Sequence, residues 1–356
     1  MESILPLHED TKRFDLPDGL ALESGERLDR VEIAYRTWGT LDPDGANAVV
    51  VCHALTGSAD VDGWWPGLMG PGRALDPSRD FIVCANVLGS CYGTTGPVSL
   101  DPATGRPYGP DFPAVTIRDM VRPQIELARS LGVSRVRTAL GGSLGGMQAI
   151  EWALMAPDLV ESIVVIGVSG RHSAWCIGLS EAQRQAIAAD PLWRDGRYDP
   201  ENPPAAGLGV ARMIAMCTYR SRDSFQDRFG RDEQEPGLFA VESYLRYQGR
   251  KLAGRFDANG YVALTRAMDT HDVSRGRGAY EDVLGGLRVP ALVVTLERDL
   301  LYPRSEQEEL AALLPEARLV ELPSRNGHDA FLIEVDELSE MLVSFLGSLP
   351  GKGGRP

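Results

Sequence analysis

The sequence lacks an apolar run long enough to cross a bilayer, and its start has neither the basic residues nor the apolar core of a secretory signal peptide. Its five cysteines form no C-x-x-C pair, and their odd number argues against a disulfide framework. The chain also lacks an excess of positive charge: 36 lysines and arginines stand against 50 acidic residues, and the formal net charge of -14 disfavours binding to a phosphate backbone. We therefore expect a cytoplasmic protein whose partners include neither a membrane nor a nucleic acid.

The length of 356 residues allows one large domain with an insertion or two ordinary domains. The segments 48–52 and 80–86 are almost continuously apolar, which is typical of strands covered by helices on both faces. Segments 20–23 and 31–38 alternate apolar and polar side chains, as half-buried antiparallel strands do. Further strands are expected at 136–140, 163–168, 291–296 and 318–322. Because helical segments separate them, the sequence predicts an α/β fold with a mostly parallel central sheet flanked by helices.

Between residues 171 and 280 the pattern changes. Strand-like runs vanish, and helical segments at 180–189 and 207–219 are broken by Asp-Pro, Asn-Pro-Pro and glycine. We interpret this region as a helical lid inserted into the α/β fold.

The domain organisation follows from this interpretation. Residues 1–170 and 281–350 should form the core around the inserted lid. Within the core, residues 1–18 are polar without a period and are expected to form an extended arm. Residues 351–356 are expected to be a disordered tail.

The stretch around Ser143 organises the chain. It reads Gly141-Gly142-Ser143-Leu144-Gly145, after an apolar run and before a helix-forming segment. A G-x-S-x-G nucleophile needs this context of strand, sharp turn and helix, because the turn holds the serine hydroxyl out of the sheet. The glycines let neighbouring backbone approach closely. A glycine-rich turn with an incidental serine would give the same five residues. Residues elsewhere in the chain must therefore show whether Ser143 is a nucleophile.

A serine nucleophile needs a base that a third group orients. Among the five histidines, His328 follows the last expected strand, where an α/β-hydrolase places its base, and Asp299 lies at the end of the preceding strand. A capping role would explain each residue alone. The order Ser143, Asp299, His328 is that of an α/β-hydrolase triad, and we predict this triad. His53 is a rival base, which we interpret as support for the oxyanion loop because it precedes the nucleophile.

The oxyanion hole of such an enzyme uses two backbone N–H groups. One should belong to Leu144, the residue after the nucleophile. The other should come from the loop after an early strand, at Leu55 in the segment 53–57.

Six segments along the chain carry a family resemblance. They are His53-Ala-Leu-Thr-Gly-Ser58, Asp62-Gly-Trp-Trp65, Asn86-Val-Leu-Gly-Ser-Cys-Tyr-Gly-Thr-Thr-Gly-Pro97, Thr116-Ile-Arg-Asp-Met-Val121, Gly141-Gly-Ser-Leu-Gly-Gly-Met-Gln-Ala149 and Gly327-His-Asp-Ala-Phe-Leu332. In this combination the chain from about residue 14 to 347 resembles the homoserine O-acetyltransferase family. Members of that family have an α/β-hydrolase core with a helical lid.

The resemblance implies transfer of an acetyl group from acetyl-CoA to the side-chain hydroxyl of L-homoserine, a step of methionine biosynthesis. It implies a ping-pong reaction in which Ser143 takes the acyl group and passes it on, with His328 as base and Asp299 orienting that base. Acetyl-CoA is expected as a co-substrate, with no bound cofactor and no metal. A homodimer that forms through the lid is also implied.

The resemblance further points to three substrate-binding residues. Arg212 matches the family's lid arginine near the amino-acid substrate, and a guanidinium suits a carboxylate. Asp329, beside the base, matches the acid thought to meet the substrate ammonium, and Tyr219 is the third candidate. An inter-helix salt bridge for Arg212, a cap for Asp329 and a core position for Tyr219 remain open as alternatives.

Two positions depart from the family pattern. Ser90 stands where a second glycine is usual before the cysteine, and Glu297-Arg298 stand before Asp299 where a small polar residue and an aspartate are usual. These departures leave succinyl-CoA as donor and L-serine as acceptor open, and an esterase on the same core is a further alternative. A deep tunnel under the insertion would exclude water and so suits transfer better than hydrolysis.

Overall fold

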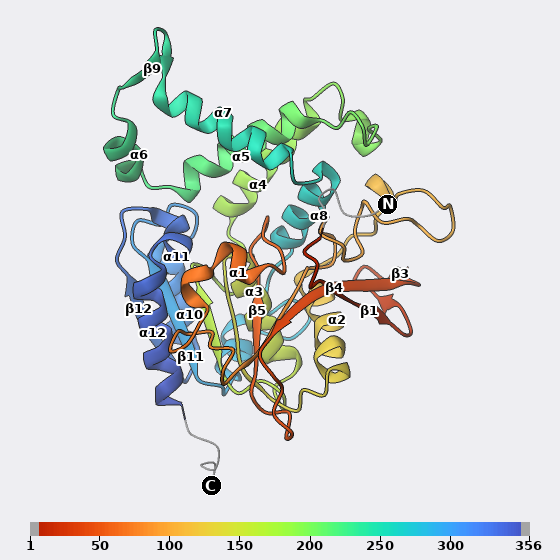
Figure 1. Cartoon of the computed structure of the whole chain (residues 1–356), viewed down its shortest axis with the longest axis vertical. Helices are drawn as coiled ribbons and strands as arrows, with labels where there is room; N and C mark the ends of the chain where they lie inside the picture. Colours follow the sequence, from red (N-terminus) through yellow and green to blue (C-terminus); the bar gives the residue numbers. More distant parts are fainter. Residues whose placement is uncertain (1–6, 350–356) are drawn as a thin grey trace.

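The computed structural model describes residues 7–349, and an eight-stranded sheet flanked by helices forms its centre (Figure 1). The strands lie in the order β1-β4-β6-β5-β7-β8-β11-β12. They are β1 (Lys12–Leu16), β4 (Val31–Trp38), β5 (Ala48–Cys52), β6 (Phe81–Ala85), β7 (Val136–Gly142), β8 (Ile163–Ile166), β11 (Ala291–Leu296) and β12 (Ala317–Leu322). β4 runs antiparallel to its neighbours β1 and β6, and the other pairs are parallel. The mostly parallel α/β sheet predicted from the sequence is confirmed.

The central strands of the sheet are buried on both faces, because their successive side chains enter two different hydrophobic cores. In β5, Val50 and Cys52 enter one core, whereas Val49 and Val51 enter the other. The first core lies under α2 (Ile117–Ser130), α3 (Leu144–Met155), α9 (Tyr280–Gly285) and α10 (Arg304–Leu313). The second lies under α1 (Val61–Trp64), α11 (Ala330–Ile333) and α12 (Val335–Ser348). Short 3-10 turns are η1 (Pro66–Leu68), η2 (Gly109–Asp111), η3 (Arg194–Gly196) and η4 (Gly327–Asp329).

The expectation of an extended arm over residues 1–18 is wrong for residues 12–16. These residues form the edge strand β1, which pairs with β4 along its whole length. Phe14 and Leu16 are half-buried against the core, while the side chains of Lys12, Arg13 and Asp15 are exposed. An edge strand tolerates such polar residues, and this explains why the apolar signal is weak. The next two strands, β2 (Leu20–Ala21) and β3 (Arg27–Leu28), form a separate hairpin. The first six residues of the expected arm lie outside the described part of the chain.

A helical insertion lies between β8 and β11, and Figure 1 shows it at one end of the sheet. Its elements are α4 (Ala174–Ala188), α5 (Ala205–Tyr219), α6 (Arg222–Phe229), β9 (Glu233–Glu235), β10 (Leu238–Phe239), α7 (Ala240–Ala253) and α8 (Ala258–Asp269). Helix α5 packs between α4 and α7. It crosses α7 so closely that a Cβ on Gly249 would lie 2.7 Å from the carbonyl oxygen of Gly209.

The insertion differs from the sequence expectation in two details. Helix α4 begins before residue 180, because the side chain of Ser173 accepts a hydrogen bond from the N–H of Cys176 and caps the helix there. The hairpin of β9 and β10 is an unexpected strand pair, built from exposed and half-buried residues. The domain boundaries at residues 171 and 280 stay a prediction, and the expected tail at 351–356 lies outside the described residues. Within residues 7–349 no helix combines the length and apolar character needed to cross a membrane.

Both ends of the insertion leave the core at one place, which we call the neck (residues 170–173 and 271–273). The N–H of His172 donates to the carbonyl of His271 at 2.9 Å, and the N–H of Val273 donates to the carbonyl of Gly170 at 3.0 Å. The two passages of the chain therefore form an antiparallel bridge. Backbone hydrogen bonds, rather than a loose linker, fix the base of the insertion.

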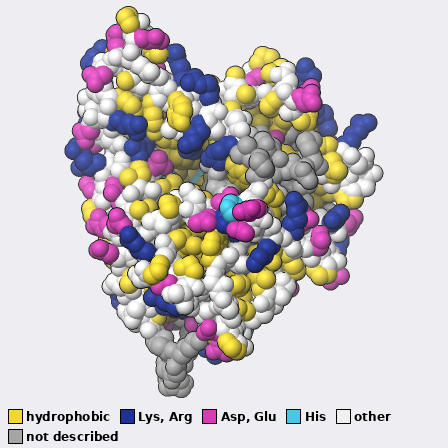
Figure 2. All heavy atoms as spheres, viewed as in Figure 1, with side chains coloured by type: hydrophobic (Ala, Val, Ile, Leu, Met, Phe, Trp, Pro, Cys, Tyr) yellow, Lys and Arg dark blue, Asp and Glu magenta, His cyan; other side chains and the backbone are white. Residues whose placement is uncertain are grey.

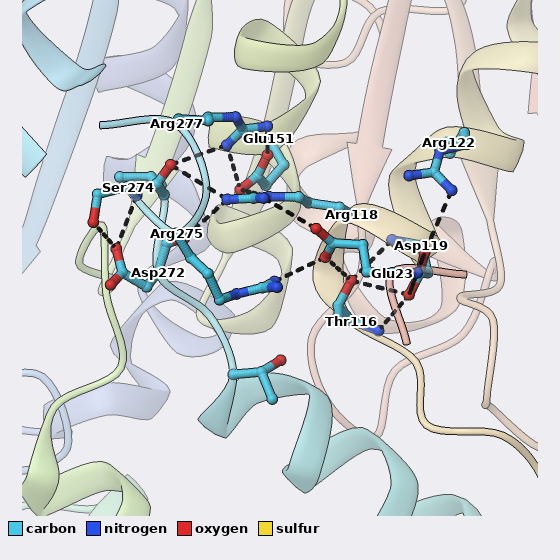
Figure 3. A network of polar contacts seen from close by, with 12 residues as sticks. Glu23, Thr116, Arg118, Asp119, Arg122, Glu151, Asp272, Ser274, Arg275 and Arg277 are labelled. Carbon is cyan, nitrogen blue, oxygen red and sulfur yellow. Dashed lines mark hydrogen bonds and ion pairs between the residues drawn. The ribbon is translucent and has the colours of Figure 1, made fainter. Parts of the chain in front are cut away.

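A network of charged side chains fastens the neck to the core (Figure 3). Glu151 on α3 is 1% exposed and accepts hydrogen bonds from Nε of Arg118 at 3.2 Å and from Nη2 of Arg277 at 2.6 Å. Arg118 also donates to the carbonyl of Asp272 in the neck at 3.1 Å, and it pairs with Glu23 at 3.0 Å. Because an unpaired buried carboxylate is costly, these contacts hold α2, α3 and the neck in one geometry.

Candidate active site

The predicted catalytic residues gather at the edge of the sheet where the parallel strands end. Ser143 follows β7 directly, Asp299 lies in the loop after β11, and His328 lies in η4 after β12. All three residues are buried, and α5 of the insertion packs on η4. The space-filling view shows the surface hollowed where the insertion meets the core (Figure 2).

Ser143 sits on a strained backbone turn, with φ 56° and ψ -123°. Its N–H donates to the carbonyl of Ile166 at 2.9 Å, which fixes the turn against β8. The flanking glycines are required for space, because a Cβ on Gly141 or Gly145 would lie 2.6 Å or 2.1 Å from the carbonyl oxygen of Cys52. The strand, sharp turn and helix predicted around the serine are therefore present.

His328 and Asp299 form a hydrogen-bonded pair. Nδ1 of His328 lies 2.7 Å from Oδ2 of Asp299, while Oδ1 of Asp299 accepts hydrogen bonds from the N–H groups of Leu301 at 2.8 Å and Tyr302 at 3.0 Å. Burial alone would lower the pKa of His328, but the charge and hydrogen bond of Asp299 and the charge of Asp329 raise it. The carboxylate thus holds the proton on Nδ1 and leaves Nε2 free to accept one.

Gly167 connects the serine turn to this pair. It follows Ile166, the residue that binds the N–H of Ser143, and a Cβ on it would lie 3.3 Å from Cε1 of His328 and 3.4 Å from Oδ2 of Asp299. In residues 7–349 neither the Ser143 hydroxyl nor Nε2 of His328 has a hydrogen-bond partner. Such contacts are often long before substrate binds and shorten in the reacting complex. The geometry brings the predicted triad together with the serine and the base both unengaged.

The two backbone groups predicted for an oxyanion hole follow two neighbouring strands, Leu55 after β5 and Leu144 after β7. Leu144 is the first residue of α3, where an N–H has no partner within the helix. Leu55 lies in the turn after β5, which His53 supports: Nε2 of His53 accepts from the N–H of Val87 at 3.1 Å, and Nδ1 donates to the carbonyl of Ala54 at 2.9 Å. Burial lowers the pKa of His53 to about 4. With both ring nitrogens engaged, His53 supports the loop and is not available as a base.

The three predicted substrate-binding residues lie beside His328. The guanidinium of Arg212 lies 5.2 Å from the ring centroid of Tyr219, and that ring lies 5.7 Å from the ring of His328. Burial raises the pKa of the Asp329 carboxyl, while the positive charge of Arg212 acts to lower it. A cation and a carboxylate thus lie close enough to influence each other beside His328, an arrangement that suits a ligand carrying both charges.

A pocket adjoins these residues and is lined by Leu55, Tyr219 and Leu301 together with side chains of α4 and α8. A larger surface cavity lies beside β1 and the segment 93–102, and it includes none of the predicted site residues. The smaller pocket is the one that adjoins the candidate site, because the predicted residues Leu55 and Tyr219 line it.

Two aromatic residues at the site are not singled out by the sequence argument. Tyr302 is fully buried with its ring centroid 5.5 Å from that of His328, and the ring of Phe331 stands edge-on to His328 at 5.7 Å. A Cβ on Gly142 would lie 2.7 Å from the Phe331 ring, so this ring also packs under the serine turn. Their closeness in sequence to Asp299 and His328 is the signal that could have found them.

The departure at Arg298 has a structural effect. Arg298 adopts φ 60°, a conformation that asparagine and aspartate accommodate more easily than arginine. Its guanidinium pairs with Asp223 on α6 and with Glu297. The loop that carries Asp299 is thereby tied to the insertion by a contact that the usual residue types would not make in the same way.

Known proteins match almost the whole chain. A family model described as the alpha/beta hydrolase fold matches residues 47–335. The homoserine O-acetyltransferase of Chlorobaculum tepidum is 58% identical over 339 residues, which is 95% of this chain and 95% of that protein. The homoserine O-acetyltransferase of Trichormus variabilis is 56% identical over 344 residues, 96% of both.

Solved structures agree with these relatives. The homoserine O-acetyltransferase from Bacillus anthracis superposes with a TM-score of 0.89 at 27% identity, covering 96% of this chain and 98% of that one. Esterase E22 superposes with a TM-score of 0.87 at 28% identity, covering 94% and 99%. Since relatives above half identity extend over nearly the full length, the chain belongs to the homoserine O-acetyltransferase family, on the α/β-hydrolase fold.

Proposed function

We propose that the protein transfers an acetyl group from acetyl-CoA to the side-chain hydroxyl of L-homoserine, a reaction of methionine biosynthesis. The observation that carries the proposal is the hydrogen-bonded Asp299–His328 pair beside the Ser143 turn, in a chain 58% identical to a homoserine O-acetyltransferase. We propose the cytoplasm as its compartment, which suits a chain whose five cysteines are all free thiols.

In the first half-reaction, Oγ of Ser143 attacks the carbonyl carbon of the acetyl thioester while Nε2 of His328 takes the serine proton. The N–H groups of Leu55 and Leu144 stabilise the negative charge that develops on the carbonyl oxygen. The carbon–sulfur bond then breaks, and His328 gives its proton to the departing thiolate. CoA leaves, and an acetyl ester remains on Ser143.

In the second half-reaction, His328 removes the proton from the homoserine hydroxyl, and that oxygen attacks the acetyl ester. The same oxyanion hole stabilises the second tetrahedral intermediate. When the bond to Ser143 breaks, His328 returns the proton to the serine oxygen, which restores the enzyme. Asp299 keeps His328 in the tautomer that both half-reactions require.

Homoserine needs two charged partners in addition to the base. Arg212 would bind its carboxylate, Asp329 would bind its ammonium, and Tyr219 would pack against the substrate between them. These roles are supported by the position of all three side chains beside His328. Holding both ends of the amino acid aims its side-chain hydroxyl at the acetyl ester.

We further propose that residues 171–280 act as a lid and as the surface of a homodimer. Transfer requires that water be kept from the acetyl ester until the acceptor binds, and a lid over the site would do this. The insertion exposes large apolar side chains that a second copy would cover: Trp175 is 54% exposed, Val210 45% and Tyr247 53%.

The test is CoA release by the purified protein from acetyl-CoA. Release should be fast with L-homoserine and slow with L-serine, because one methylene in a fitted pocket discriminates by about 10- to 200-fold. Without an acceptor, only about one CoA per active site should appear. Continuous release of CoA without an acceptor would show that the protein is a hydrolase, as the likeness to esterase E22 allows. Faster release from succinyl-CoA than from acetyl-CoA would identify succinyl-CoA as the donor.

Replacing Arg212 by methionine should raise the KM for homoserine about 10- to 100-fold, since a hydrogen bond to a charged group contributes about 1.5–3 kcal/mol. The initial burst of CoA, which requires no homoserine, should stay as in the wild type. Arg129→Met is the matched control, because Arg129 is an exposed residue of α2 that pairs with Glu126. If the burst falls as far as homoserine turnover, Arg212 supports the fold of the site and does not bind the acceptor.

A further inference from the structure

The turn that carries Leu55 is fixed at its first peptide by the core. The N–H of Gly57 donates to the carbonyl of Ala54 at 2.8 Å, and His53 donates to the same carbonyl at 2.9 Å. A trans peptide unit is planar with its N–H opposite its C=O, so holding the Ala54 carbonyl also aims the N–H of Leu55. We call residues 54–57 the oxyanion turn.

The far end of the oxyanion turn is held by Arg255, which the insertion supplies between α7 and α8. Nη1 of Arg255 donates to the carbonyl of Thr56 at 2.8 Å, and Nη2 donates to Oγ1 of Thr56 at 3.4 Å. Nη1 also donates to the hydroxyl of Tyr92 at 2.6 Å, and that hydroxyl donates to the backbone carbonyl of Arg255 at 3.0 Å. Four hydrogen bonds thus link one lid residue to two loops of the core.

The hydrogen-bond partners of the Arg255 guanidinium are all uncharged. Arg255 is half-buried, and in the described part of the chain its guanidinium forms no ion pair and binds only neutral oxygens. Many other arginines of the chain sit against carboxylates, as Arg118 and Arg277 do on Glu151. Burial of a cation costs solvation energy, and here the hydrogen bonds to neutral oxygens of Thr56 and Tyr92 offset part of that cost.

Residues next to Arg255 also pack the insertion against the core loop that follows β6 and contains Tyr92. The ring of Phe256 stands edge-on to Tyr92 with 5.6 Å between centroids. The backbone of α8 comes so near the loop after β6 that a Cβ on Gly260 would lie 3.3 Å from the carbonyl oxygen of Gly89. The position of the oxyanion turn therefore depends on how the insertion sits on the core.

We infer that Arg255 is a positioning residue that holds the oxyanion turn from the insertion, so that the N–H of Leu55 is aimed at the reacting carbonyl when the insertion is seated. It acts through the Thr56 carbonyl and does not touch the substrate. The inference rests on the proposed function, and specifically on Leu55 as an oxyanion donor. It makes the lid a part of the acylation machinery as well as a cover.

Arg255→Met should slow acylation of Ser143, measured as the single-turnover burst of CoA, by about 10²-fold, the scale of a 1 Å misplacement at a reacting centre. The affinity for an alkyl boronic acid should fall by a similar factor, because its adduct with Ser143 is a tetrahedral anion that needs the same N–H groups. The KM for homoserine and the inhibition constant of free CoA should not change. Arg255→Lys should recover part of the rate, since an ammonium also donates to the Thr56 carbonyl, and Arg129→Met is the control.

Other outcomes overturn the inference. Weaker inhibition by CoA with unchanged binding of the boronic acid would make Arg255 a ligand of the CoA phosphates. If Arg255→Met does not fold, the variant Tyr92→Phe tests the inference instead. It removes the hydroxyl that accepts a hydrogen bond from Arg255, and it should lower both the burst rate and the affinity for the boronic acid about 5-fold. No change in Tyr92→Phe would then refute the positioning role. A wild-type protein that releases no CoA would refute the proposed function instead, before any variant is compared.

Discussion

Replacing Ser143 by alanine is expected to lower kcat for acetyl transfer by about 10⁶-fold, the scale on which a Ser-His-Asp triad fails without its nucleophile. The hydroxyl is the only side-chain group of the residue that the proposed reaction uses, and Nε2 of His328 has no hydrogen-bond partner among residues 7–349. The measurement is CoA release from acetyl-CoA with L-homoserine present. Mass spectrometry of the intact protein adds a second readout, because the wild type without acceptor should carry one acetyl group and the variant none.

The fold of this variant should be intact. Alanine meets the same strain as serine at φ 56°, and the N–H that binds Ile166 is unchanged. Thermal unfolding should therefore stay near that of the wild type, and the variant should still bind CoA. Transfer that persists within 10²-fold of the wild type would mean that another nucleophile carries the acyl group.

Asp299→Asn is expected to lower kcat by about 10⁴-fold, through the tautomer of His328 rather than through its position. The N–H groups of Leu301 and Tyr302 bind Oδ1 of Asp299, so the amide oxygen of asparagine would take that place. Its NH₂ group would then face Nδ1 of His328. The imidazole would have to carry its proton on Nε2, where it can no longer accept the proton of Ser143.

The pH profile of this variant separates an electrostatic role from a structural one. Burial lowers the pKa of His328, and the charge of Asp299 opposes that effect and raises it. A base must be neutral to act, so activity rises as the pH passes the pKa of His328. Without the Asp299 charge that pKa falls, and the remaining activity of Asp299→Asn should reach its plateau at a lower pH than in the wild type. An unmoved acidic limb, or a loss below 10-fold, would contradict the role of Asp299; Asp336→Asn, at an exposed site, is the control.

The sequence predicts the candidate triad because each buried strand leaves its own apolar run in the sequence, and the three residues each follow such a run. An apolar run marks each buried strand, and β4, β5 and β11 have the bounds that their residue patterns predict. In a parallel sheet the carboxyl ends of strands share one edge, so residues that follow separate runs must meet. Ser143, Asp299 and His328 are of this kind, although their catalytic roles stay a prediction.

Features that depend on tertiary contacts escape the same argument. The edge strand β1 carries a weak apolar pattern, because solvent covers one of its sides. Tyr302 and Phe331 read as ordinary core aromatics until their rings are seen against His328. Arg255 is hidden most completely, because its partners at Thr56 and Tyr92 lie far away in the chain and are neutral. No spacing or charge pattern reports a contact of that kind.

The neck also bears on how such a protein can diverge. The N–H of Val273 reaches the carbonyl of Gly170 at 3.0 Å, so the chain returns to the core where it left. During evolution another segment could replace the insertion at the neck without altering the strand order, provided that its two ends also lie side by side. Changes in the insertion could then alter what reaches Ser143, Asp299 and His328, while the strands that position these three residues stay the same.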